Sequence, residues 1–146
     1  MAEIPDYLRH SIQTLYRDFL ESKNLKPRLG QKQMIAEVAR ILARIGDKDG
    51  PPIGFIEAGT GTGKTLAYLV GAVPYAMERE MQLVISTATV SLQSQLIDKD
   101  IPELTESTDL MLSFALAKGR RRYLCPIRLE ASLEAVAKGH VVYPDE

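Results

Sequence analysis

A glycine-rich stretch in the first half of the chain has the residue types and spacing that bind phosphate. It runs E-A-G-T-G-T-G-K-T over residues 57–65 and includes Gly59, Gly61 and Gly63. Glycine adopts, at little steric cost, the backbone conformations that turn successive N–H groups toward phosphate oxygens. Lys64 would add a positive charge for the β- and γ-phosphates, and the Thr65 hydroxyl would bind Mg²⁺. The stretch predicts a nucleoside triphosphate site.

This stretch fits the phosphate-loop pattern of a small residue, four variable positions and Gly-Lys-Thr, with Ala58 in the first position. The pattern needs a strand before it and a helix after it. We expect a short buried strand at 53–58 and a helix over 65–77, which Pro74 should kink or interrupt. This context favours a phosphate site over a flexible loop that carries Lys-Thr by chance. It does not choose between ATP and GTP, or between a kinase, a GTPase, a transporter ATPase and a helicase.

The remaining elements are predicted from the spacing of apolar residues. Helices are expected over 6–20, from about 34 to 45, over 90–99 and over 131–140, and strands at 82–89 and 110–117. Apolar strands that alternate with helices favour the α/β class. We therefore expect a parallel sheet flanked by helices, preceded by an N-terminal helical segment.

The composition indicates the class of chain and its compartment more than its function. The chain has 146 residues, of which 45% are hydrophobic and 25% charged, so one packed core is expected. A net charge of -1 gives no overall basic surface of the kind that binds nucleic acid, so any such contact must be local. Cys125 is the single cysteine, which excludes an internal disulfide. No leader or membrane-spanning run is visible, so we expect a soluble cytoplasmic protein with no membrane partner.

Three further stretches bear on the class of protein. In P-R-L-G-Q-K-Q-M-I, the Gln31 amide can donate to and accept from adenine, although a glutamine there can also be a cap or solvated. In V-I-S-T-A-T-V-S-L-Q-S-Q-L, Thr87 and Thr89 can hold nucleic-acid phosphates, or Thr89 or Ser91 can cap a helix. The third, A-K-G-R-R-R-Y-L-C-P, is either a solvated basic turn or a segment that contacts phosphates and ligates a cluster.

In their order along the chain, these stretches resemble the motifs of DinG-type helicases, iron–sulfur enzymes of the XPD-like group in helicase superfamily 2. P-R-L-G-Q-K-Q-M-I resembles the Q motif. The glycine-rich stretch resembles motif I, and V-I-S-T-A-T-V-S-L-Q-S-Q-L resembles motif Ia. K-G-R-R-R-Y-L-C-P resembles the segment that holds the first cluster cysteine. The resemblance implies a partial RecA-like P-loop NTPase domain at the N-terminus of an ATP-dependent DNA helicase. It also implies 5′ to 3′ translocation on single-stranded DNA and a role in DNA repair.

The resemblance further implies which residues bind each ligand. Adenine would be recognised by Gln31 and Arg28, and Lys64 and Thr65 would be the catalytic residues that hold the triphosphate and Mg²⁺. The full set of implied nucleotide-binding residues is Arg28, Gln31, Ala58, Gly59, Thr60, Gly61, Thr62, Gly63, Lys64 and Thr65. Single-stranded DNA would contact Thr87, Thr89 and Gln93. Cys125 would be the first ligand of a [4Fe–4S] cluster that only the full-length protein could hold.

Several parts of such a helicase are missing from this sequence. No Asp-Glu-Ala-His box is present, and Asp145 and Glu146 are excluded as its remnant because Pro144 cannot pair fully within a central strand. The other cluster cysteines and a second motor domain are missing too. We therefore expect a fragment, with N-terminal helices at 1–50, a partial core at 51–118 and the start of an iron–sulfur insertion at 119–146. Alone it should bind nucleotide with negligible hydrolysis and no unwinding.

Two other classes of protein remain open at this point. A small P-loop kinase would use Arg120, Arg121 and Arg122 in a lid over its acceptor, but would leave Gln31 and the threonine-rich stretch without a role. A nucleotide- or DNA-binding module without catalysis would fit the missing acidic box. Titration with ATP and single-stranded DNA distinguishes these classes, because a kinase ignores DNA and a pure DNA-binding module ignores ATP.

Overall fold

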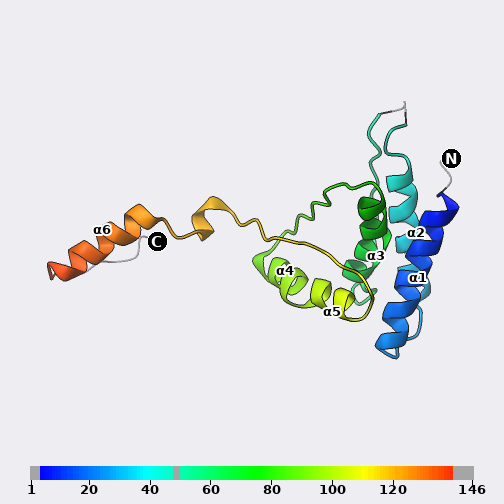
Figure 1. Cartoon of the computed structure of the whole chain (residues 1–146), viewed down its shortest axis with the longest axis horizontal. Coiled ribbons are helices and arrows are strands. Elements are labelled where there is room, and N and C mark those ends of the chain that lie inside the picture. Colours follow the sequence, from blue (N-terminus) through cyan, green and yellow to red (C-terminus); the bar gives the residue numbers. More distant parts are fainter. Residues whose placement is uncertain (1–3, 48–49, 140–146) are drawn as a thin grey trace. The chain divides into compact units, whose positions relative to one another are not determined.

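The computed structural model describes residues 4–47 and 50–139, and every regular element within these ranges is a helix (Figure 1). The chain divides into two compact units, Met1–Leu112 and Ser113–Glu146. In the described ranges, no helix combines the length and the apolar character needed to cross a membrane.

Three long helices make up most of the first unit: α1 (Asp6–Ser22), α2 (Leu29–Ala43) and α3 (Lys64–Glu78). The helix predicted over 6–20 is confirmed as α1, and its buried residues follow the predicted spacing, from Leu8 through Ile12 to Phe19. The second predicted helix is confirmed as α2, which begins earlier than its apolar residues indicated. Gly46 follows α2 with a φ of +98°, a left-handed conformation that suits a residue ending a helix.

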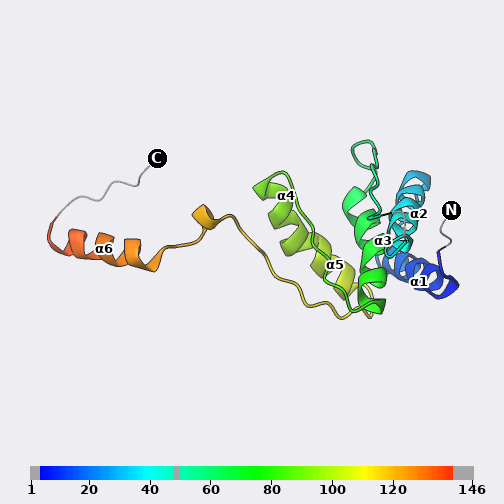
Figure 2. The same cartoon turned by 90° about the horizontal axis from the view of Figure 1, so that it is seen from above.

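Helix α3 is the central helix of the first unit and packs against both α1 and α2 (Figures 1 and 2). Its middle is buried without a break from Leu69 to Tyr75. Gly71 lets α2 approach closely, because a Cβ there would lie 2.9 Å from Val38 Cγ1 and 3.1 Å from the Ile35 carbonyl oxygen. The packing of α2 on α3 therefore depends on the missing side chain at position 71.

Pro74 lies inside α3 but does not end it. The predicted interruption is wrong, because the helix continues to Glu78. Proline removes one backbone donor and crowds the preceding turn, which usually breaks a helix. Here Pro74 and its neighbours are buried in the core, and that packing offsets the lost hydrogen bond.

Residues 90–106 form a run of three helical segments: α4 (Val90–Gln95), the π-helical η1 (Leu96–Asp100) and α5 (Ile101–Glu106). The helix predicted over 90–99 is confirmed in position, but the helical run extends further than predicted. Pro102 stands in the first turn of α5, where a missing N–H is tolerated. Leu96, Ile101 and Leu104 are buried, and η1 packs against α3.

The second unit contains the 3₁₀ turn η2 (Arg120–Arg122) and helix α6 (Pro126–Ala137). Pro126 is a favourable first helical residue, which explains why α6 begins before the helix predicted over 131–140. The Tyr123 hydroxyl closes the arginine turn by accepting a hydrogen bond from the Lys118 backbone N–H at 2.9 Å. Neither described helix of this unit has a buried residue.

The parallel sheet predicted from the sequence is absent from residues 4–47 and 50–139, so the predicted α/β class, a partial RecA-like sheet flanked by helices, is wrong for this structure. The candidate strands at 53–58, 82–89 and 110–117 are irregular, and no backbone hydrogen bond recorded among the described residues joins two of them. Phe55 is 97% exposed and Met111 90% exposed, so these segments are not buried runs. An apolar run forms a strand only when a neighbouring strand pairs its backbone, and none of the three supplies that neighbour for another.

The close contact at Gly71 predicts a loss of stability when a methyl group is added. Gly71→Ala should lower the free energy of unfolding by about 1–3 kcal/mol, because the new Cβ meets the α2 backbone. Gly30→Ala is the matched control, since it is also helical and its Cβ would lie 3.5 Å from Thr62 Cγ2, an ordinary contact. Chemical unfolding followed by circular dichroism measures both variants, and equal stability of the two would contradict this account of the α2 and α3 packing.

The buried hydroxyl of Tyr75 leads to the opposite expectation. It has no hydrogen-bond partner in the described part of the chain, so it carries the cost of desolvation without compensation. Tyr75→Phe should leave the free energy of unfolding unchanged or raise it by about 1 kcal/mol. Tyr16→Phe removes a hydroxyl that donates to Gln31 Oε1 at 2.7 Å, and should lower it by about 1 kcal/mol. Thermal unfolding compares the two, and an equal loss in both would be the contrary result.

Candidate nucleotide-binding site

The glycine-rich stretch forms a loop that leads directly into α3. The helix predicted after the loop is therefore confirmed, although the strand predicted before it is wrong. Gly61 and Gly63 have φ angles of +78° and +81°, in the left-handed region that favours glycine, whereas no positive φ is recorded for Gly59. Two of the three glycines are thus required by the backbone conformation of the loop.

The N-terminus of α3 offers backbone donors to an anion. Gly63 is the N-cap and contributes no side-chain hydrogen bond, and the helical ladder starts with the Ala67 N–H, which donates to the Gly63 carbonyl at 3.0 Å. The N–H groups of the residues before Ala67 have no partner within the helix. Together with the positive end of the helix dipole, they make this terminus suitable for a phosphate group.

Lys64 folds back over the loop. Its ammonium group donates to the carbonyl oxygens of Ala58 at 2.7 Å and Gly59 at 3.0 Å. The Thr62 hydroxyl also donates to the Gly59 carbonyl, at 2.7 Å. Because Lys64 is exposed, its ammonium group can exchange these carbonyls for phosphate oxygens without disturbing the core.

Two residues predicted to recognise adenine, Arg28 and Gln31, both bind the backbone of this loop. A guanidinium nitrogen of Arg28 donates to the Gly61 carbonyl at 2.7 Å, and Gln31 Nε2 donates to the Gly63 carbonyl at 3.1 Å. The contact at Gly63 is close, since a Cβ there would lie 2.3 Å from Gln31 Nε2. The start of α2 is thus tied to the phosphate loop more than thirty residues along the chain.

Tyr16 is a polar partner of this site that the sequence did not reveal. Tyr16 lies on the buried face of α1, and its hydroxyl donates to Gln31 Oε1 at 2.7 Å. Burial raises the pKa of Tyr16, and a backbone hydrogen bond from Arg28 and the Arg28 charge partly oppose this effect. The only signal in the sequence was the residue type, because a tyrosine on a buried face usually brings its hydroxyl to a partner.

The predicted magnesium ligand Thr65 is half-buried in the first turn of α3. Burial raises the pKa of Tyr68, while a hydrogen bond with the Thr65 side chain lowers it and the charge of Asp100 raises it. Thr65 and Tyr68 lie one turn apart on the same helix. Thr65 lies at the N-terminal end of α3, directly after the glycine-rich loop.

The predicted DNA-contacting residues lie at and just before α4. The Thr89 hydroxyl is the N-cap of this helix and accepts a hydrogen bond from the Leu92 N–H at 3.2 Å, so the structural alternative of a capping role is confirmed. The Thr87 hydroxyl donates to the Thr89 carbonyl at 3.2 Å. Gln93 is half-buried within α4. Whether these residues contact DNA stays a prediction.

A cavity of about 580 Å³ is lined by residues of α1, α2 and the connection between them. Its lining is mostly apolar and includes Ile12, Tyr16, Leu20 and Ile35. None of the predicted nucleotide-binding residues lines it. The side chain of Tyr16 therefore contributes to this cavity and also bonds to Gln31.

Comparison with known proteins gives the chain its relatives. No protein-family model matches it. The ATP-dependent DNA helicase DinG of Photobacterium profundum is 49% identical over 109 residues, which cover 74% of this chain and 16% of the relative. The ATP-dependent helicase DinG of Mycobacterium tuberculosis is 44% identical over 112 residues, with the same coverage of 74% and 16%. The DinG helicase of Salmonella typhimurium is 48% identical over 105 residues, covering 72% and 14%.

This chain is homologous to the DinG helicases. Its resemblance to that family, first inferred from short motifs, is thereby shown over most of its length. The chain spans about a sixth of the length of these DinG relatives.

The second unit holds the residue that the DinG resemblance links to an iron–sulfur cluster. Cys125 is exposed and immediately precedes α6. The described residues contain no group of three or more histidine, cysteine, aspartate or glutamate side chains that could hold a metal ion. Asp145 and Glu146, which were excluded as a remnant of the acidic box, lie outside the described residues.

The loop glycines of this DinG homologue should differ in their tolerance of alanine. Gly63→Ala forces a left-handed φ and a contact with Gln31, Gly61→Ala forces only the φ, and Gly59→Ala does neither. Holding an alanine at a left-handed φ costs about 1–2 kcal/mol. The free energy of unfolding, measured by denaturant titration, should therefore fall most for Gly63→Ala, less for Gly61→Ala and least for Gly59→Ala. A largest loss at Gly59 would refute this reading of the loop.

Proposed function

We propose that this chain forms the ATP-binding part of a DinG-type, ATP-dependent DNA helicase. The observation that carries the proposal is the link between two predicted adenine-recognising residues and the phosphate loop, Arg28 to Gly61 and Gln31 to Gly63. This link gathers residues suited to a base and donors suited to phosphates at the start of α3. The relatives are named ATP-dependent DNA helicases, which supports the same assignment.

The residues at the loop fit a nucleoside triphosphate. In the proposed complex, the phosphates are surrounded by the α3 N-terminus and by loop residues that include Ala58, Thr60, Thr62 and Gly63. The Lys64 ammonium moves from the Ala58 and Gly59 carbonyls onto the β- and γ-phosphates and offsets their charge. Mg²⁺, when bound with the nucleotide, neutralises phosphate charge. Thr65 would hold this ion through its side-chain hydroxyl.

The other predicted roles belong to the whole helicase. Thr87, Thr89 and Gln93 would lie along a single-stranded DNA path, with Thr89 also keeping its place as the cap of α4. Movement would run 5′ to 3′, in DNA repair. Cys125 would contribute one thiolate to a [4Fe–4S] cluster, and the described residues alone do not fit such a cluster because it needs four ligands. The proposed organisation keeps N-terminal helices at 1–50, a nucleotide-binding part at 51–118 and an insertion from 119.

The chain by itself should bind ATP without using it efficiently. Hydrolysis by such motors needs a carboxylate that positions Mg²⁺ and the attacking water, and the sequence contains no Asp-Glu-Ala-His box. The loop supplies positive charge and backbone donors, which serve binding. The proposal therefore predicts nucleotide affinity with negligible turnover.

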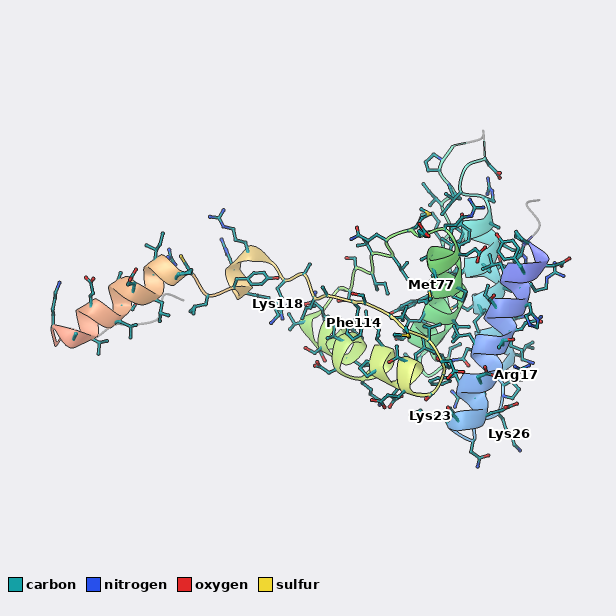
Figure 3. All side chains as sticks on the ribbon, viewed as in Figure 1. Arg17, Lys23, Lys26, Met77, Phe114 and Lys118 are labelled. Carbon is teal, nitrogen blue, oxygen red and sulfur yellow. The ribbon has the colours of Figure 1, made fainter. Side chains whose placement is uncertain are left out.

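Calorimetric titration of the 146-residue chain with MgATP tests the assignment. Lys64→Ala should weaken binding by about tenfold or more, because it removes hydrogen bonds between a charged group and phosphate. Lys26→Ala is the matched control and should bind as the unmodified chain does, since Lys26 is exposed in the connection before α2 (Figure 3). Equal binding by the two variants would contradict the proposal.

Addition of single-stranded DNA separates a helicase part from the other classes. DNA should weakly change ATP affinity if the chain belongs to a DNA motor, whereas a kinase would ignore it. DNA-stimulated ATP hydrolysis that is lost in Lys64→Ala would disprove the expectation that this chain binds without turnover. DNA binding with no ATP binding would instead support a plain DNA-binding module.

A further inference from the structure

We infer that Tyr16 is a positioning residue that fixes the orientation of the Gln31 amide and thereby sets selectivity for adenine over guanine. The inference rests on the proposed ATP binding at the phosphate loop. It assigns a role at the nucleotide site to α1, a helix from which the sequence motifs predicted no contact.

Gln31 is nearly buried, with 6% of its surface exposed, and both ends of its amide are engaged. The oxygen Oε1 accepts from the Tyr16 hydroxyl at 2.7 Å, and Nε2 donates to the Gly63 carbonyl at 3.1 Å. The amide thus bridges α1 and the N-cap of α3. A buried side chain with a specific partner at each end has one favoured orientation.

The direction of the Tyr16 hydrogen bond decides which orientation that is. A phenol hydroxyl has one hydrogen to donate and also accepts. In the structure this hydrogen is donated to Gln31 Oε1, so the Tyr16 hydroxyl requires an acceptor at that end of the amide. A flipped amide would place an NH₂ group against that hydrogen and an oxygen against the Gly63 carbonyl, and both contacts would be repulsive.

Among the described residues, the fixed amide has one hydrogen-bonding position left at each end. Its oxygen can accept two hydrogen bonds and its NH₂ group can donate two, so one acceptor site and one N–H remain. Adenine presents an N6–H donor beside the N7 acceptor, which complements this pair. Guanine presents O6 beside N7, two acceptors, and would set O6 against Oε1. An amide held in this orientation therefore favours adenine, whereas an amide free to flip discriminates less.

Tyr16→Phe tests this role because it removes the hydroxyl and keeps the ring in the core. Binding of MgATP, MgGTP and tripolyphosphate is measured by titration of the full chain. In the unmodified chain ATP should bind more tightly than GTP. Tyr16→Phe should reduce the ratio of ATP to GTP affinity by about three- to tenfold, the worth of one hydrogen bond, and leave tripolyphosphate binding within about twofold.

Two further variants control for indirect effects. Tyr75→Phe makes the same chemical change at another buried tyrosine, whose hydroxyl has no partner among the described residues, and should leave the ATP to GTP ratio unchanged. Gln31→Ala should reduce the ratio, and adding Tyr16→Phe to it should have no further effect, because both changes remove one pathway of base recognition.

The possible results separate this inference from the proposed function. If Tyr16→Phe weakened the binding of all three ligands to the same extent, the positioning role would be overturned. The assignment of ATP binding would still stand. An unchanged ATP to GTP ratio in Tyr16→Phe would overturn it as well. Failure of the unmodified chain to bind any of the three ligands would overturn the proposed function and this inference together. The side-chain amide resonances of Gln31 give a check that needs no nucleotide. In Tyr16→Phe, the two Nε2 hydrogens should become more alike in chemical shift and in exchange rate.

Discussion

Burial of the middle of α3 is the constraint on which the candidate site depends. The residues from Leu69 to Tyr75 are all buried, and they pack against both α1 and α2. Apolar burial of this extent fixes the helix firmly, at about 25 cal/mol for each Å² removed from water. Because the helix is held at its middle, its N-terminus and the glycine-rich loop attached to it have a defined position despite being exposed.

A second set of forces acts at the loop, and these are polar. Arg28 and Gln31 reach the loop from α2, and Tyr16 reaches Gln31 from α1. The two neutral hydrogen bonds contribute about 1 kcal/mol each and the bond from the Arg28 guanidinium about 1.5–3 kcal/mol, so together they cannot define the fold. They set the orientation of a few carbonyls and one amide within a frame that apolar packing has built. The division is useful for a binding site, because its polar groups can exchange partners while the frame stays in place.

The helices were predicted correctly from the sequence, whereas the predicted sheet is absent from the described residues, and the reason is the range of the interactions involved. α1, α2 and α4 are specified by apolar spacing within one segment, and their hydrogen bonds are internal to that segment. A strand depends on another segment for its hydrogen bonds, and the runs around Phe55, Val84 and Met111 leave these side chains exposed without such a partner. The loop motif predicted Lys64 and Gly63 as nucleotide-binding residues from local spacing alone. It could not reveal Tyr16, because the hydroxyl matters only through a contact with α2.

The polar groups of the site are hydrogen-bonded to one another, and this determines which bonds an incoming ligand would replace. The Lys64 ammonium is bonded to the Ala58 and Gly59 carbonyls, so an incoming phosphate must replace two charge-assisted hydrogen bonds rather than fill an unpaired position. That replacement is favourable because a phosphate carries a full charge and the α3 N-terminus adds its dipole, whereas a carbonyl carries only a partial charge. The bonds made by Arg28 and Gln31 need no such exchange, since the carbonyls of Gly61 and Gly63 are structural partners. Phosphate binding would therefore change the partners of Lys64 and leave the link from α2 to the loop in place, so that the side chains proposed to read the base would already be positioned when the phosphates bind.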